Sequence, residues 1–425
     1  MTAAVPETTI EAAPPAPAAP RPRVLFLNRS YWPDVEATGQ LLTELCSDLA
    51  RTHDVAVICG QPNRAGGPEK PPRFQRETYQ GVNIVRVRSR RFSKTSLWSR
   101  ALGLLSYLVL ASWAALWQRR PDIIVAETDP PVLGALGVLL KWRHRCRLVV
   151  YLQDLYPEVG LVLGKLRPGL LTWTLRQATQ FGLRHADRIV VLAEDMKQRV
   201  LDRGIPAERI DIVPNWADAE LLRPGVANDE LRREWNPAGH LAVMYSGNLG
   251  LSQKLDDVLA AARELRDAPA AFLFVGDGAA KQRLQAQAAS WQLDNVRFFP
   301  YQPKARLRGS LQAGDVHLVP LQRGLAGCIV PSKLYGILAC GLPYLAIVDA
   351  DSEAARITRD HHCGRWVEPD SVPALVDAIR WCLDHRAELK EMGQRGRTLA
   401  EREYDRPVCV RRFKAVLDEL THVRA

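Results

Sequence analysis

The chain has 425 residues, 47% of them hydrophobic and 24% charged, which is the composition of a globular protein with more than one domain. Its eight cysteines include no CxxC pair and its nine histidines no HExxH motif, so we expect a reducing compartment, no disulfide framework and no protein-held metal. The net charge of +10 comes without a zinc finger, an RNP pattern or a KH loop, so we expect no nucleic-acid partner.

The first 22 residues are rich in alanine and proline and contain no apolar block. Such a composition buries too little surface to order itself, so we predict a disordered tail at 1–22. The tail also lacks the basic start and apolar centre of a signal peptide, and we therefore expect the protein in the cytoplasm.

From Arg23 onward, short apolar runs alternate with longer segments of helical periodicity. The predicted strands of the first half are RVLFLN, DVAVICG, PDIIVAE, RLVVYLQD and DRIVVLA. Continuous apolar strands that alternate with helices are typical of a parallel sheet covered on both faces.

The same alternation restarts after a polar, proline-containing passage that follows IDIVPNWAD. We therefore predict an α/β protein with two doubly wound, Rossmann-like domains, 23–216 and 217–400. Ligands of open α/β sheets bind outside the carboxyl ends of the strands, so we expect the active site in a cleft where the two domains face each other.

The segment 97–117 is a predicted helix with 17 uncharged residues from Ala101 onward, and it lies in a stretch, 86–209, that holds 21 Lys and Arg against 10 Asp and Glu. Its length is at the lower limit for spanning a membrane, and a buried helix would also satisfy the alternation. The basic residues before it and its aromatic residues favour a third interpretation, a helix lying on an anionic leaflet. The predicted membrane-surface residues are Arg88, Arg90, Arg91, Lys94, Trp98, Trp113 and Trp117, with Tyr107 as a further interfacial aromatic.

Three turns at predicted strand ends carry glycines suited to a phosphate group. Gly39 precedes the first helix, Gly250 precedes a helix with Lys254 near its start, and Gly276 lies in the turn VGDG. Glycine permits close backbone approach, and a helix amino end carries partial positive charge. Each could also be a loop glycine without a ligand, but three such turns in one predicted cleft indicate a phosphate-bearing ligand.

The stretch CIVPSKLYGILACGLP, residues 328–343, predicts a helix that is entered at Pro331 and capped by Ser332. Lys333 lies in its first turn, where a cation opposes the helix dipole unless an anion is bound there. Lys333 is therefore either a solvated lysine or a ligand for an anion.

Asp154 ends a predicted strand in YLQDLYPEVG. A carboxylate at a strand end in a cleft is placed for proton transfer or for binding sugar hydroxyls, and capping of the next helix is the structural alternative.

Several motifs together resemble those of the GT-B-fold glycosyltransferases of family 4, over residue 23 to about residue 420. These motifs are YWPDVEATG, ADRIVVLAEDM, VPNWAD, YSGNLG, FVGDG and VPSKLYGILACGLP. The SGNLG and PSK forms are similar to those of the branch that assembles bacterial exopolysaccharide or O-antigen repeat units. The resemblance implies a GT-B fold in which a final helix, 401–425, packs back toward the first, acceptor-side domain.

The resemblance also implies a hexosyltransferase that moves a sugar from a nucleotide donor with retention of configuration, without a metal or other cofactor. Positive groups and helix amino ends would stabilise the leaving diphosphate, and Asp154 stands where many relatives carry a histidine beside the transferred sugar. Lys333 and Asp154 are the implied catalytic residues. The implied donor-binding residues are Gly39, Asn248, Gly250, Lys254, Gly276, Asp277, Ser332 and Lys333, with Gly276 and Asp277 near the base and ribose.

The sequence departs from the family pattern at two places. The two glutamates spaced E-x7-E in many relatives correspond here to Cys328 and Gly336. In the SGNLG loop, Asn248 stands at the position of an arginine, and Gln253 with Lys254 replaces a lysine-glycine pair. Our hypothesis is that Lys333 supplies the charge that this loop lacks.

These observations favour a glycosyltransferase on the inner face of the cell membrane, with a polyprenyl-diphosphate-linked or saccharide acceptor and an anionic membrane surface as partners. A nucleotide-sugar 2-epimerase of the same fold would need no membrane and would turn over without an acceptor. A catalytically degenerate subunit of another transferase would explain the missing glutamates.

Overall fold

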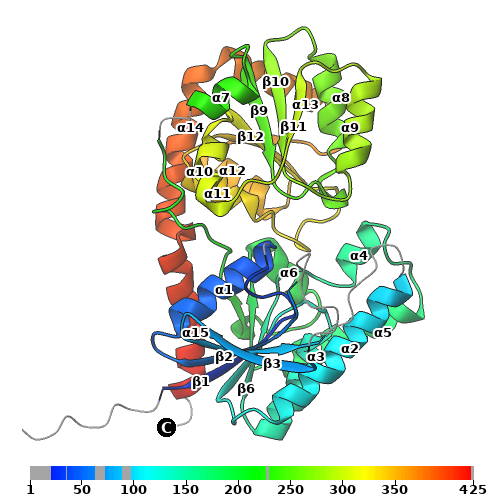
Figure 1. The fold of residues 1–425 in the computed structure, drawn as a ribbon, viewed down its shortest axis with the longest axis vertical. Helices are drawn as coiled ribbons and strands as arrows, with labels where there is room; N and C mark the ends of the chain where they lie inside the picture. The colour runs from blue at the N-terminus through cyan, green and yellow to red at the C-terminus, as the bar shows by residue number, and fades with distance from the viewer. Residues whose placement is uncertain (1–20, 35, 63–71, 89–96, 226–228, 423–425) are drawn as a thin grey trace, which may run out of the picture.

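The computed structural model describes residues 21–34, 36–62, 72–88, 97–225 and 229–422, which form two α/β domains stacked end to end (Figure 1). Nearly all of the tail predicted to be disordered, 1–22, lies outside the described residues. Arg90, Arg91 and Lys94 of the predicted membrane surface also lie outside them.

The first domain is built on an eight-stranded sheet in the order β3-β4-β2-β1-β5-β6-β7-β8. Neighbouring strands pair in parallel except for β3, which runs antiparallel to β4. The strands are β1 (Arg23–Leu27), β2 (Asp54–Gly60), β3 (Phe74–Tyr79), β4 (Val82–Val87), β5 (Ile123–Ala126), β6 (Arg147–Tyr151), β7 (Arg188–Val191) and β8 (Ile210–Ile212).

Helices cover both faces of this sheet, as the buried apolar strands require (Figure 1). On one face, α3 packs against α2 and α5, and on the other α1 packs against the last helix of the chain, α15 (Arg406–His422). The helices of this domain are α1 (Ala37–Leu49), α2 (Leu97–Leu116), α3 (Leu133–His144), α4 (Glu158–Val162), α5 (Leu170–His185), α6 (Glu194–Leu201) and the 3-10 turn η1 (Ala207–Arg209).

The second domain contains a six-stranded parallel sheet in the order β11-β10-β9-β12-β13-β14. Its strands are β9 (Leu241–Ser246), β10 (Ala270–Val275), β11 (Val296–Phe299), β12 (Val316–Pro320), β13 (Tyr344–Ile347) and β14 (Arg365–Val367). Its helices are α7 (Asp229–Trp235), η2 (Leu251–Gln253), α8 (Asp256–Glu264), α9 (Lys281–Ser290), α10 (Lys304–Gln312), α11 (Lys333–Ala339), α12 (Glu353–His361), α13 (Val372–Asp384), α14 (Arg386–Leu399) and the π-helical turn η3 (Ala400–Tyr404). The predicted fold class, two Rossmann-like domains facing each other, is confirmed.

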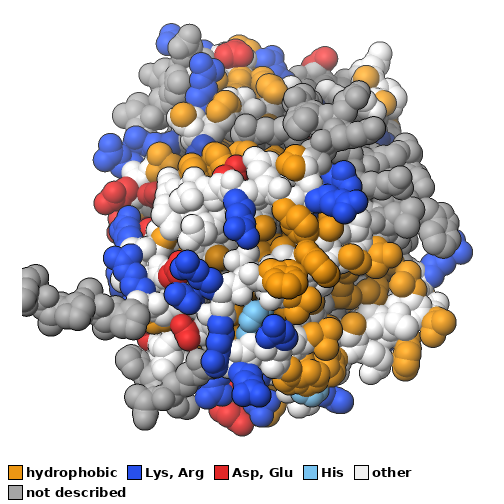
Figure 2. Space-filling model, turned by 60° about the horizontal axis from the view of Figure 1, so that its bottom comes forward, with side chains coloured by type: hydrophobic (Ala, Val, Ile, Leu, Met, Phe, Trp, Pro, Cys, Tyr) orange, Lys and Arg blue, Asp and Glu red, His pale blue; other side chains and the backbone are white. Residues whose placement is uncertain are grey.

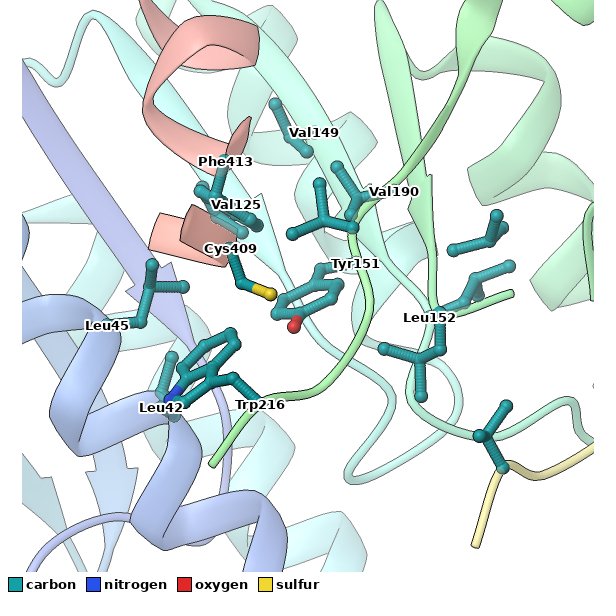
Figure 3. Packing of buried hydrophobic residues seen from close by; sticks show 14 of the residues in the cluster. Leu42, Leu45, Val125, Val149, Tyr151, Leu152, Val190, Trp216, Cys409 and Phe413 are labelled. Carbon is teal, nitrogen blue, oxygen red and sulfur yellow. The ribbon is translucent and has the colours of Figure 1, made fainter. Parts of the chain in front are cut away.

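The chain returns to the first domain along the left edge of Figure 1, where α14 lies beside the second domain and α15 beside the first. Phe413 of this helix contacts the rings of Phe26 and Tyr151, at centroid separations of 6.4 Å and 5.1 Å. Figure 3 shows Cys409 and Phe413 pointing toward Tyr151 at the end of β6. Arg406 adds an ion pair to Asp48 of α1, with 2.7 Å between Nε and Oδ2. The last helix therefore belongs to the core of the first domain and ties the two domains together.

The helix α2 has one buried and one exposed side. Tyr107, predicted to be interfacial, is fully buried and donates a hydrogen bond from its hydroxyl to the carbonyl of Ile58 at 3.2 Å, so that prediction is wrong. The opposite side exposes Trp113, and Trp117 directly after the helix is also exposed, which their predicted membrane-surface role requires. Within the described part of the chain, every helix is too short or too polar to cross a membrane.

Candidate active site

A cavity of about 550 Å³ lies where the two domains meet, at the carboxyl ends of the second sheet's strands. The first domain contributes Leu163 to its lining, just after α4. The second domain contributes Gly250 and Lys254 from the β9–α8 turn and Gln322 and Arg323 from the loop after β12. The predicted cleft is therefore present, and two of the predicted donor-binding residues line it.

Lys333 lies at the start of α11 and reaches back to the β9–α8 turn. Its Nζ donates a hydrogen bond to the hydroxyl of Tyr245 at 2.9 Å and lies 4.5 Å from the centre of that ring. A Cβ atom at Gly247 would be 3.1 Å from Cε of Lys333, so the lysine stem packs against the SGNLG loop.

Lys333 is half-buried, and no carboxylate of the described residues forms an ion pair with its ammonium group. Burial lowers the pKa of Lys333 to about 8, because the charged form loses hydration without gaining a counter-ion. Lys333 is not among the residues that line the cavity, but it packs against the turn that contributes Gly250 to that lining. A partly buried cation in this state is suited to an anionic ligand, which would raise its pKa again.

Ser332 precedes α11 as predicted, but its side chain makes no capping hydrogen bond. Its backbone has φ −57° and ψ −25°, which is helical. A capping serine normally adopts extended backbone angles so that its oxygen can reach the free amides, and Ser332 therefore does not act as the predicted cap.

Lys254 is already neutralised by carboxylates of its own domain. It pairs with Asp370, and its Nζ lies 3.4 Å from Oδ2 of Asp257. The hydrogen bond to Asp370 raises the pKa of Lys254. Arg323 also pairs with Asp370, at 2.9 Å. Contact with a diphosphate would require Lys254 to exchange these partners, so Lys254 is less available to an anion than Lys333.

The two glycine turns of the second domain pack directly against each other. Gly276 has φ +144°, and a Cβ atom there would lie 2.0 Å from the carbonyl oxygen of Gly247. A Cβ at Gly278 would lie 2.6 Å from Oδ1 of Asn248. Asp277 is exposed beside this contact, and its Oδ1 accepts a hydrogen bond from the amide of Gly278 at 2.8 Å. These glycines are therefore needed for packing, whether or not a ligand approaches them.

Gly39 is the third residue of α1 and does not precede the helix as predicted. The helical backbone angles of α1 begin at Ala37, two residues before the glycine. A Cβ at this position would meet Ser30 at 3.5 Å, an ordinary contact, so sterics do not require glycine there.

In the first domain, Asp154 lies just after β6 and faces the other domain. Its amide is 3.3 Å from Oγ1 of Thr128, and its backbone forms an antiparallel bridge with Ile329 of the β12–α11 loop. Burial, and second the charge of Asp129, raise the pKa of Asp154 to about 6. A carboxyl group with this pKa can exchange a proton near neutral pH.

Two further carboxylates that we did not predict follow β5 in the sequence AETDPP. Asp129 forms a two-point ion pair with Arg29, with 3.0 Å from Nε to Oδ1 and 3.0 Å from Nη2 to Oδ2. Glu127 is 1% exposed, and neither side-chain oxygen has a hydrogen-bond partner among the described residues. Burial, and then the charges of Asp129 and Asp154, raise the pKa of Glu127 well above its ordinary value, which favours the protonated carboxyl group in the folded protein.

Glu127 and Asp154 line one small cavity of about 20 Å³ together with Thr128, Tyr156 and Arg203. This volume holds about one water molecule. The signal that could have revealed Glu127 is its position directly after the buried strand β5, which pairs with β6, the strand that Asp154 follows.

The two positions at which many relatives carry glutamates hold no carboxylate here. Cys328 is 1% exposed at the domain interface, and its carbonyl accepts a hydrogen bond from the amide of Leu155 at 2.8 Å. Gly336 lies inside α11. Within the described parts of the chain, no group of three or more His, Cys, Asp or Glu side chains is arranged to hold a metal ion.

Two family descriptions match the chain, one to each domain. Residues 37–216 match the glycosyl transferase 4-like domain, and residues 228–399 match the glycosyl transferases group 1 domain.

Two relatives match over most of the chain. One is WcaI of Escherichia coli (strain K12), named as a colanic acid biosynthesis glycosyl transferase, which is 32% identical over 92% of this chain and 98% of its own. Another is WbjE of Pseudomonas aeruginosa, named as a glycosyltransferase, which is 28% identical over 78% of this chain and 83% of its own.

Solved structures share the two-domain fold at low sequence identity. Sucrose-phosphate synthase from Thermosynechococcus elongatus superposes with a TM-score of 0.73 at 17% identity, covering 95% of this chain and 100% of its own. HepE from Anabaena, solved with UDP and glucose, superposes with a TM-score of 0.70 at 15% identity, covering 94% of this chain and 100% of its own. At these identities the likeness shows the fold.

Proposed function

The chain belongs to the glycosyl transferase family whose two domains it matches, and on this premise we propose that it is a retaining, metal-independent hexosyltransferase of family 4. Its donor is a nucleotide sugar, and its acceptor is a polyprenyl-diphosphate-linked or saccharide chain in the synthesis of a cell-surface polysaccharide. The observation that carries this proposal is Lys333, a cation without a counter-ion beside the glycine turn of an inter-domain cleft.

The donor diphosphate lies between the SGNLG loop and the start of α11 in this proposal. Lys333 is the charge that stabilises the leaving diphosphate, and the amides of the β9–α8 turn, near Gly250, contribute partial positive charge. HepE, a protein of the same fold, was solved with UDP and glucose, which supports a nucleotide-sugar donor here. Asn248 and Asp277, both exposed at this end of the sheet, face the remaining parts of the nucleotide.

Asp154 is the proposed contact to the sugars on the other side of the cleft. Its partly charged carboxyl group binds a sugar hydroxyl, and its pKa of about 6 leaves it mainly ionised at neutral pH. In a retaining transfer, the acceptor hydroxyl attacks the anomeric carbon from the side on which the diphosphate leaves, and the diphosphate takes the proton. Asp154 then needs only to orient the sugar.

The lipid part of the proposal rests on a surface that we name the apolar face. Its members are large hydrophobic side chains of three adjacent helices, exposed by 38% to 77%: Leu105, Val109, Trp113, Leu116 and Trp117 in or next to α2, Leu139 and Trp142 in α3, and Leu170, Leu171 and Trp173 in α5. Figure 2 shows hydrophobic side chains gathered on one side of the bottom of the molecule, with Lys and Arg side chains near them.

Exposed cations accompany the apolar face on the same elements. They are Arg119 and Arg120 after α2, Arg143 and Arg145 at the end of α3, and Lys165, Arg167, Arg176 and Arg184 in or before α5. Apolar side chains with neighbouring cations favour an anionic bilayer, with the protein lying on the inner face of the cell membrane. Of the other predicted membrane-surface residues, Arg88 directly follows β4 and is half-buried, and the side chain of Trp98 lies outside the described part of the structure.

A ligand screen tests the donor part. UDP-, GDP- and dTDP-sugars are added to the purified protein, and the melting temperature is measured, because a bound ligand stabilises the native state by mass action. We expect stabilisation by one nucleotide class. No stabilisation by any of the three, confirmed by calorimetry, would favour a non-catalytic subunit, and turnover of donor without acceptor would favour an epimerase.

Co-sedimentation tests the lipid part. We expect the protein to sediment with vesicles that contain phosphatidylglycerol and to sediment less with phosphatidylcholine alone. Equal recovery in the supernatant with and without anionic vesicles would contradict the membrane assignment.

A further inference from the structure

Helix α6 of the first domain holds a loop of the second domain by side-chain hydrogen bonds. This loop, 322–330, connects β12 to α11 and is named the donor loop here. Oδ2 of Asp195 accepts a hydrogen bond from the amide of Gly327 at 3.0 Å, and Arg199 donates two to the carbonyl of Ala326, at 3.1 Å from Nε and 2.8 Å from Nη2. One carboxylate and one guanidinium of α6 therefore bind the N–H and the C=O of a single peptide group, the one between Ala326 and Gly327, across the domain boundary.

The same oxygen of Asp195 also binds a second element of that domain. It accepts a hydrogen bond from the amide of Glu353, the first residue of α12, at 2.9 Å. The other oxygen accepts from the amide of Met196 at 2.7 Å, which fixes the orientation of the carboxylate. Asp195 thus links α6 both to the donor loop and to the amino end of α12.

The donor loop approaches α6 too closely for a side chain at its centre. Gly327 has φ +69°, and a Cβ there would lie 2.6 Å from the carbonyl oxygen of Asp195 and 2.8 Å from Cγ of Arg199. Directly after it, the carbonyl of Cys328 accepts from the amide of Leu155, and Ile329 bridges to Asp154. The donor loop is therefore attached along 326–329 to two separate segments of the first domain.

The attached residues lie directly before the proposed diphosphate ligand in the chain. Four residues after Ile329, α11 begins with Lys333. The donor loop also carries Cys328, where relatives of the resembled family have a glutamate. A cysteine has no carboxylate and so cannot bind a sugar as a glutamate would. The backbone carbonyl of Cys328 instead contributes to the contact between the two domains. The position of the donor loop therefore bears on the position of Lys333.

We propose that Asp195 and Arg199 are positioning residues of the donor site. They hold the donor loop against the first domain and so fix where Lys333 meets the donor diphosphate. The proposal rests on the proposed function for the identity of the ligand, but the attachment itself can be tested on the protein without ligand.

The first test is hydrogen exchange of the full chain, measured by mass spectrometry. In Asp195→Ala, the amides of Gly327 and Glu353 lose their acceptor, and we expect peptides that contain them to exchange about ten-fold faster or more. Asp195→Asn keeps an oxygen that can accept from the same two amides, so we expect it to restore most of the protection. Asp202→Ala is the matched control, because the Asp202 side chain, directly after the same helix, accepts from Gln198 of α6.

Arg199→Ala provides a second variant in case Asp195→Ala does not fold. Loss of the Arg199 side chain should accelerate hydrogen exchange in the donor loop, because Arg199 donates to the carbonyl of Ala326. The peptide that contains Glu353 should exchange nearly as in the wild type, because its amide donates to Asp195. Unchanged exchange of the donor loop in both variants would overturn the proposal.

The second test is binding of UDP, GDP and dTDP by calorimetry. We expect Asp195→Ala to bind the nucleotide that the wild type binds about ten-fold more weakly, with Asp195→Asn between the two. With a donor in hand, we expect Asp195→Ala to lower kcat and Asp195→Asn to restore it. Wild-type affinity and kcat in Asp195→Ala, despite faster exchange, would refute positioning. Absence of nucleotide binding by the wild type would instead contradict the proposed function, and exchange would still decide the attachment.

Discussion

Replacing Lys333 by methionine should strengthen the fold while weakening the donor site. The substitution keeps an unbranched stem against Gly247 but removes the charge that burial disfavours. The folded-state pKa of Lys333 is about 8, below the 10.5 of an unburied lysine, so the charged lysine opposes folding below pH 8 and this cost disappears above about 10.5. Since the side chain is partly exposed, we expect Lys333→Met to raise the free energy of unfolding at pH 7 by on the order of 1 to 3 kcal/mol.

The same substitution should reduce affinity for the nucleotide found by the ligand screen. A charge-assisted hydrogen bond to a diphosphate contributes about 1.5 to 3 kcal/mol, so we expect a roughly ten- to hundred-fold rise in Kd. In the wild type, Kd should also rise as the pH passes 8, by about ten-fold between pH 7 and 9, because the free lysine loses its proton there. Lys333→Met should not show this pH dependence.

Calorimetry at pH 7 and pH 9 and urea unfolding at pH 7 measure both effects. Lys390→Met is the control, because Lys390 is an exposed lysine of α14. Unchanged affinity together with unchanged stability in Lys333→Met would show that Lys333 is a solvated surface lysine, and the reasoning from its burial would be refuted.

Three further predictions test other parts of the structure. In the wild type, the raised pKa of the buried Glu127 carboxyl group lowers the free energy of unfolding as the pH rises above 4.5, because the folded state favours the protonated form. Glu127→Gln should remove this loss of stability. Urea unfolding at pH 5 and pH 8 measures the effect, and a wild-type-like pH dependence in the variant would contradict it. Gly276→Ala should lower stability by on the order of 2 to 4 kcal/mol, whereas Gly169→Ala, where a Cβ meets nothing within 4 Å, should change the melting temperature little. Trp117→Ala combined with Trp142→Ala should reduce sedimentation with anionic vesicles without lowering the melting temperature, since these side chains are 71% and 54% exposed; unchanged sedimentation would exclude the apolar face.

The fold was predictable because the strands are continuous apolar runs and their spacing repeats in both halves. The position of Lys333 was also predictable, because the entry of α11 after a proline fixes it in the first turn. The role of Lys333 depends on the groups that its side chain contacts in the fold. Its partner Tyr245 lies 88 residues earlier in the chain and is brought close by the pairing of β9 with β12.

The sequence could not show which cations were already paired. Lys254 follows a glycine turn, as a phosphate ligand would, but its partner Asp370 is 116 residues away and reaches it only in the folded domain. We predicted Tyr107 at the membrane surface from its residue type alone. Its position in the helical repeat, however, decides on which side of α2 its ring lies. Tyr107, Ala111 and Ala115 share the buried side of α2, and Val109, Trp113 and Trp117 share the exposed one.

The measurement that tests the account most directly is mass spectrometry of the acceptor after reaction. The protein is incubated with the nucleotide sugar that stabilises it and with a polyprenyl-diphosphate-linked saccharide in anionic vesicles, beside the Lys333→Met variant. We expect the acceptor to gain one hexosyl group with wild-type protein, with release of the nucleoside diphosphate, and to gain little with the variant. An unmodified acceptor while the donor is converted to another sugar, or equal transfer by both proteins, would contradict the account.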